Sequence, residues 1–143
     1  MRRRDNAGAI EALQAQVAVD FNNIEAARKL AQLLRETGVT DPARLAPVYG
    51  RIIAIDPFDA EARAAYGRVL MKQNKADAAV REFKAVVAMH PVDQAAAFTD
   101  LAESYFQSGK RTEARRQTLA ALEVAPSYER AQDLLLKLAE ARP

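Results

Sequence analysis

Apolar residues recur along this chain at offsets of three, four and seven, the spacing of one face of an α-helix. Leu45, Tyr49 and Ile52 illustrate that spacing. β-Branched residues never alternate with polar ones over a useful length, so no strand is predicted. We therefore predict an all-α chain of about eight helices, near residues 7–20, 24–37, 42–55, 59–73, 76–89, 94–108, 111–124 and 127–141.

The helical pattern repeats with a period near 35 residues. Three prolines lie 34 and 35 residues apart: Pro57, Pro91 and Pro126. A set of small residues has intervals of 36 and 35: Ala31, Gly67 and Ala102. A second set has intervals of 34 and 35: Leu45, Ala79 and Ala114. The unequal intervals place the extra residues in predicted loops, which absorb changes of length at little cost, so the pattern indicates a tandem repeat.

Local signals predict where helices begin and end. Asp41-Pro42 is a capping residue followed by a proline suited to the first helical position. Gly38 and Gly109 fall where a first helix should terminate. Three residues that follow the prolines are expected to cap the next helix: Asp59, Asp93 and Ser127.

The repeat resembles the tetratricopeptide repeat (TPR) family over about residues 7–141. The unit at 95–126 carries the resemblance best, through Phe98, Leu101, Ala102, Tyr105, Gly109, Ala114, Ala121 and Pro126. The resemblance implies an α-solenoid, a right-handed superhelix of helix-turn-helix units; a helix bundle with chance spacing is the alternative. We expect a disordered basic tail (1–6) and then a single domain, comprising a partial repeat (7–23), three repeats (24–59, 60–94 and 95–126) and a capping helix (127–141).

The resemblance also implies a function, because family members hold a partner segment on a concave wall lined by the first helix of each unit. Helical phase places nine residues on that wall: Arg28, Gln32, Arg35, Arg68, Met71, Lys72, Thr99, Glu103 and Phe106. We hypothesise that the wall binds an acidic or carboxylate-bearing segment, with an apolar side chain near Met71 and Phe106. The alternative is that the basic side chains only solvate an exposed helix face, paired with neighbouring acids. The Lys and Asn set of carboxylate-clamping members is absent.

Composition limits the chemistry further. The formal net charge is +2, from 21 basic and 19 acidic residues, and the excess lies in Arg2–Arg4. Nucleic-acid binding is therefore not favoured. The chain has no cysteine and a single histidine, His90, so we expect no metal, no cofactor and no enzyme activity. No apolar run is long enough to span a membrane. The Ala- and Arg-rich composition suggests a bacterial protein. The sequence leaves the compartment open between the cytoplasm and, if a signal was removed, the periplasm.

Both ends of the predicted stack are unusual. Leu134, Leu135, Leu136 and Leu138 cover more than one face of the last helix. Residues 7–21 resemble only the second helix of a repeat. One interpretation is an adequate cap; the other is association through the terminal helices. The alternative function is therefore that of an oligomerisation or docking module in a larger multidomain bacterial protein. That larger protein could be an enzyme, while this module would carry out no chemistry.

Overall fold

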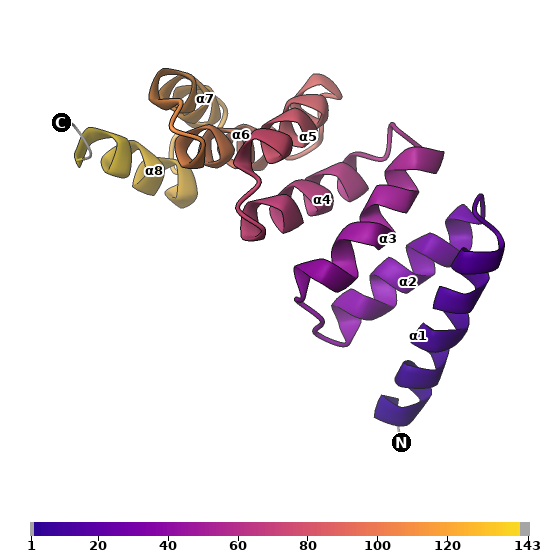
Figure 1. The fold of residues 1–143 in the computed structure, drawn as a ribbon. Coiled ribbons are helices and arrows are strands. Elements are labelled where there is room, and N and C mark those ends of the chain that lie inside the picture. Colours follow the sequence, from indigo (N-terminus) through magenta and orange to yellow (C-terminus); the bar gives the residue numbers. More distant parts are fainter. Residues whose placement is uncertain (1, 141–143) are drawn as a thin grey trace. The chain divides into compact units, whose positions relative to one another are not determined.

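The computed structural model describes residues 2–140, with side chains from Asp5 onward, and within that range it contains eight α-helices and no strand (Figure 1). The helices are α1 (Arg2–Val19), α2 (Ile24–Glu36), α3 (Pro42–Ile55), α4 (Ala60–Lys72), α5 (Ala76–Ala88), α6 (Gln94–Gln107), α7 (Arg111–Val124) and α8 (Glu129–Glu140). The predicted all-α class and number of helices are confirmed. Each of the three repeat prolines follows shortly after the end of α3, α5 or α7, so the prolines mark equivalent corners.

The N-terminal boundary differs from the prediction. We expected a disordered tail over residues 1–6, whereas α1 begins at Arg2. No proline interrupts the segment, and Gly8 is the only residue in it that strongly disfavours a helix. Hydrophobic periodicity was the wrong criterion for locating the start of this helix, because a helix can extend beyond the residues that pack against the core.

Side-chain caps fix several helix starts. The carboxylate of Asp41 accepts a hydrogen bond from the Ala43 amide at 3.0 Å, and Pro42 occupies the first turn of α3. Asp59 and Asp93 cap α4 and α6 in the same way, each at 3.0 Å from the amide three residues on. Ser127 is a wrong prediction, because the Tyr128 carbonyl accepts the first bond of α8, from the Gln132 amide.

The helices α2, α4 and α6 end in one common turn. After α2 the Val39 amide donates to the Leu34 carbonyl at 2.9 Å, and the Lys75 and Lys110 amides make the same bond after α4 and α6. The turn requires a residue with positive φ. Gly38 and Gly109 supply it at 76° and 80°, whereas the second repeat has Asn74 at 59°. Three identical turns confirm that the sequence period is a structural period.

Replacing Asn74 with glycine should stabilise the protein, because glycine adopts positive φ without the steric penalty of a Cβ atom. We expect the free energy of unfolding to rise by about 0.5–1 kcal/mol. Urea unfolding followed by circular dichroism measures the change. Gly109→Asn is the matched reverse substitution and should destabilise by a similar amount; equal stability of all three proteins would contradict this reading of the turn.

The chain divides into two compact units, Met1–Val69 and Leu70–Pro143, with the boundary inside α4. In the first unit α2 packs against both α1 and α3. Its core is formed mainly by α2 and α3, with contributions from Ile10 of α1 and from Ala62 and Val69 of α4. Leu34 has no solvent exposure and is the largest fully buried side chain of the chain's described part.

In the second unit α6 packs against α5, α7 and α8. Ala102 of α6 and Ala114 of α7 have no exposed surface, which lets these two helices approach closely. Leu134 and Leu138 of α8 complete this cluster. The predicted slot for a small residue is therefore buried in both units, at Ala31 (5% exposed) and Ala102 (0%).

Candidate functional site

Three of the predicted peptide-binding residues lie together in the first unit. Arg28, Gln32 and Arg35, one helical turn apart on α2, line a pocket of 220 Å³. Tyr49 and Ile52 of α3 form part of its lining, and so do Asp59 and Glu61 at the start of α4. The structure therefore brings these three α2 residues together in one pocket.

The cations of this pocket are already paired. Arg28 Nη2 lies 2.9 Å from Asp56 Oδ2 and 3.2 Å from Asp59 Oδ2, and Arg35 Nη1 lies 2.8 Å from Glu61 Oε1. These ion pairs join α2 to the turn that precedes α4 and to the first residues of α4. An acidic ligand here would have to compete with the carboxylates of the chain itself. The first-unit pocket is consequently nearly balanced in charge.

Burial and the ion pairs alter the titration of two side chains here. The hydrogen bond from Arg35 to Glu61 raises the pKa of that guanidinium, against the opposing effect of burial. Burial raises the pKa of the Tyr49 phenol, because desolvation disfavours the phenolate. Tyr49 therefore presents a neutral hydroxyl to the pocket at neutral pH.

A second group of predicted residues lies together in the other unit. Met71, Glu103 and Phe106 line a pocket of 510 Å³. Four residues of α8 also line it: Arg130, Asp133, Leu134 and Lys137. Leu134 is only 4% exposed, so it forms an apolar floor with Met71 and Phe106. Gln107 also lines the pocket, and its amide lies 3.4 Å from the Met71 carbonyl, connecting the ends of α4 and α6.

Arg130 organises the rim of this second pocket. Its Nη2 donates to Asp100 Oδ1 at 2.7 Å and to Glu103 Oε2 at 3.1 Å, joining α8 to α6. Burial by itself lowers the pKa of Arg130. The hydrogen bond to Asp100 and the charge of Glu103 outweigh this effect and raise the pKa above its usual value, so the guanidinium stays charged. Lys137 differs from Arg130, because it is exposed and makes no ion pair with any residue the structure describes. It is the pocket's available cation.

The structure corrects one residue of the predicted set. Thr99 has no solvent exposure, and its hydroxyl donates to the Ala95 carbonyl at 2.7 Å. It cannot contact a partner, because its side chain fills a packing position on α6. Arg68 and Lys72 are exposed on α4, one on each side of the boundary between the units.

Sequence reasoning missed the contribution of α8 to this pocket. We expected the last helix to cap the stack or to take part in association, and not to line the binding wall, yet Arg130, Asp133 and Lys137 line the second pocket. A signal was available in the sequence: α8 occupies the position of a first helix in the repeat, and first helices were predicted to line the wall.

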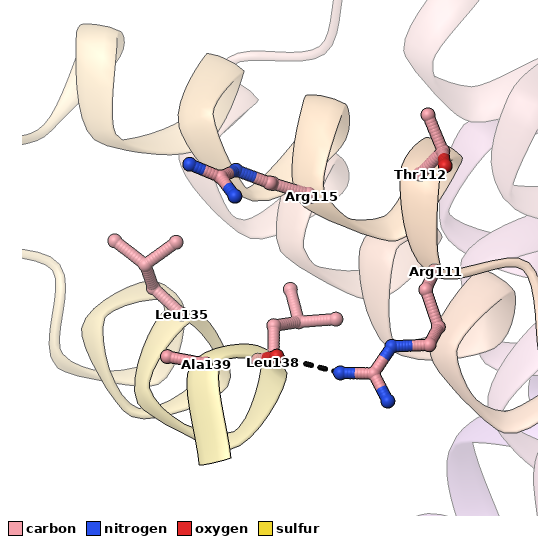
Figure 2. A pocket seen from close by; sticks show the side chains of 6 residues that line it. All are labelled: Arg111, Thr112, Arg115, Leu135, Leu138 and Ala139. Atoms are coloured by element: carbon pink, nitrogen blue, oxygen red, sulfur yellow. Dashed lines mark hydrogen bonds between the residues drawn. The ribbon is translucent and has the colours of Figure 1, made fainter. Parts of the chain in front are cut away.

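A further groove of 390 Å³ lies between α7 and α8 (Figure 2). Arg111, Thr112 and Arg115 line it from α7, and Leu135, Leu138 and Ala139 from α8. Figure 2 shows Arg111 directed at the end of α8, where its Nη2 donates to the Leu138 carbonyl at 2.6 Å. The groove therefore combines arginine side chains with an apolar wall.

Residues 2–140 show neither the arrangement of a metal site nor a helix able to span a membrane. No group of three or more His, Asp or Glu side chains there has the arrangement of a metal site. His90 lies two residues after the end of α5 and has a φ of 51°, and its amide donates to the Val87 carbonyl. No helix within that range has the length and apolarity needed to cross a membrane.

Comparison with known proteins identifies the fold. No family model matches the sequence, and no curated protein matches it. Among solved structures, MamA is similar with a TM-score of 0.80 and 22% identity, covering 97% of this chain and 80% of MamA. YrrB, described as a TPR protein with an unusual peptide-binding site, has a TM-score of 0.75 and 21% identity, covering 92% and 66%.

A third solved structure contains a ligand. The first TPR domain of Spaghetti (RPAP3), bound to the HSP90 peptide SRMEEVD, is similar with a TM-score of 0.71 and 17% identity, covering 85% of this chain and 94% of that domain. These similarities extend over most of the chain. The chain therefore has the fold of tetratricopeptide-repeat proteins, as the repeat spacing predicted.

Proposed function

We propose that this protein is an interaction scaffold that binds a segment of a partner protein in the second-unit pocket formed by α4, α6 and α8. The observation that carries the proposal is an apolar floor of Met71, Phe106 and Leu134 in the same pocket as an exposed Lys137, which makes no ion pair with the residues that the structure describes. Such a site accepts one large apolar side chain and a neighbouring carboxylate. The proposal assigns no catalytic step to the chain.

The charges favour the second unit over the first for an acidic segment. In the first-unit pocket Arg28 and Arg35 are held by the acids at the start of α4. A ligand carboxylate in that pocket would have to replace an existing ion pair, so it would add little to the free energy of binding. At Lys137 it would add a new pair, and the apolar floor beside it supplies the larger part of the affinity.

Two similar domains support the choice of ligand chemistry. The first TPR domain of RPAP3 binds SRMEEVD, and the second TPR domain of human RPAP3 is in complex with the HSP70 peptide SGPTIEEVD. Both peptides combine acidic residues with apolar ones. We carry over only that combination, because this chain lacks the Lys and Asn set expected of a carboxylate clamp.

Selection from a library of random twelve-residue peptides displayed on phage tests the proposal without assuming a ligand. The full chain is the bait, and peptides containing a large apolar residue beside Asp or Glu should be enriched. A failure to enrich any sequence, or enrichment of basic sequences, would contradict the proposed binding chemistry.

Phe106→Ala should weaken binding of a selected peptide by about tenfold, because it removes the largest apolar surface of the pocket floor. Fluorescence anisotropy with the labelled peptide measures the dissociation constant. Phe58→Ala is the matched control: Phe58 is 82% exposed and lies outside the pocket, so its loss should leave affinity unchanged. Equal affinity of both variants would place the binding site elsewhere.

A second candidate function is assembly through the terminal helices. One observation favours it: Leu136 on α8 is 62% exposed, although a leucine in a packed repeat is normally covered.

A further inference from the structure

We propose that the second-unit pocket recognises three consecutive residues of basic, apolar and acidic character, and that Asp133 selects the basic one. This inference rests on the proposed function and adds the charge pattern of the ligand to it. It follows from two opposite charges on α8, those of Asp133 and Lys137, that line the same pocket. Neither side chain makes an ion pair with the residues that the structure describes.

The other charged side chains of this pocket are already engaged with each other. Arg130 Nη2 lies 2.7 Å from Asp100 Oδ1 and 3.1 Å from Glu103 Oε2, so its single charge is shared between two carboxylates of α6. Asp133 and Lys137 are both exposed at the lining of the pocket. Among the described residues, one carboxylate and one ammonium group of this pocket are therefore left for a ligand.

The two groups are not held by one another either. Asp133 and Lys137 are four residues apart on α8, a spacing at which opposite charges on a helix can pair, yet the structure contains no ion pair between them. An exposed pair of this kind contributes little to the stability of a helix. A ligand can consequently engage both side chains without breaking a contact on which the fold depends.

The spacing of the two charges fits a segment in extended conformation. Four residues of an α-helix rise by about 6 Å, which separates Asp133 from Lys137 along α8. In an extended chain, alternate residues lie about 7 Å apart and point to the same side. A segment beside α8 can therefore direct a basic residue to Asp133 and, two residues along, an acidic residue to Lys137. The residue between them then points to the other wall, where Phe106 and Met71 line the pocket.

The carboxylate of Asp133 also disfavours a second acidic residue in the ligand. A segment with acids on both sides of its apolar residue would place one of them beside Asp133, in a pocket that Glu103 also lines. The site therefore discriminates by repulsion of that acid as well as by attraction of a basic residue. Either chain direction satisfies both charges, so the three residues read basic–apolar–acidic or the reverse.

Selection from the random twelve-residue peptide library with three full-chain baits tests the inference. The unmodified chain should enrich peptides in which one basic and one acidic residue flank a large apolar residue. The Asp133→Lys chain should instead enrich peptides with acids on both flanks. Glu123→Lys is the matched control, because Glu123 is exposed on α7 outside the pocket and undergoes the same change of charge, so its peptides should match those of the unmodified chain. Circular dichroism checks that each bait is folded.

Fluorescence anisotropy with a selected peptide provides the second measurement. Replacing the basic residue of the peptide with alanine should raise the dissociation constant about threefold for the unmodified chain and leave it unchanged for Asp133→Asn. An equal rise for both proteins, or enriched peptides without a basic flank or with charges four residues apart, would overturn this inference and leave the proposed function standing. Failure of all three baits to enrich any peptide would overturn both.

Discussion

Replacing Leu34 with alanine is expected to lower the free energy of unfolding of the first unit by about 3 kcal/mol. Leu34 has no exposed surface and lies in the core that joins α2 to its neighbouring helices. Its truncation removes a buried isobutyl group and leaves a cavity that rigid helices cannot easily fill. No other side chain in the first unit is as large and as completely enclosed among the residues described.

Urea unfolding followed by helical circular dichroism measures this change. Leu119→Ala is the matched control, since Leu119 is 44% exposed and its truncation should lower the free energy by less than about 1 kcal/mol. If the two variants lost the same stability, the core assigned to α2 would be wrong. Two transitions in the Leu34→Ala protein would further indicate that the first unit unfolds separately from the second.

Replacing Arg130 with methionine is expected to lower the free energy of unfolding of the second unit by about 2 kcal/mol. The guanidinium lies 2.7 Å from Asp100, whose side chain is only 6% exposed. Methionine keeps much of the packing volume but removes the positive charge that offsets the desolvation of this carboxylate. The estimate is below that for a fully buried pair, because the Arg130 side chain is 43% exposed.

Arg28→Met provides a control of the same geometry. Arg28 also contacts two carboxylates, but those of Asp56 and Asp59 are 38% and 17% exposed. Its loss should lower the free energy of unfolding by only about 0.5 kcal/mol. In a double-mutant cycle, Asp100→Asn should recover part of the Arg130→Met loss, because it removes the charge that arginine balanced. Purely additive effects would show that the pair does not couple α8 to α6.

The fold was predictable because backbone signals agreed with the packing slots at several corners of the repeat. Gly38 and Gly109 predicted the turns after α2 and α6, and Asp41-Pro42 predicted the start of α3; the structure has all three. The N-terminal boundary was not predictable from hydrophobic periodicity, since α1 begins at Arg2, whereas Ile10 is the first core residue among the side chains described.

The candidate site was predictable only in part. Helical phase identified Arg28, Gln32 and Arg35 as neighbours, but it could not show that acids of the following helix would pair with the two arginines. Phase also misplaced Thr99, because a β-branched hydroxyl that bonds to its own helix fits a buried position that sequence alone marks as polar. Ion pairing and burial depend on tertiary contacts that a single helix does not reveal.

The central claim is that the pocket of Met71, Phe106 and Leu134 binds the partner segment, and chemical-shift mapping tests it most directly. A selected peptide is titrated into the full chain with isotope-labelled methionine and leucine methyl groups. The account predicts that the Met71 and Leu134 methyl signals shift most and that Phe106→Ala abolishes those shifts. Shifts confined to methyl groups outside this pocket, or unaffected by Phe106→Ala, would contradict it.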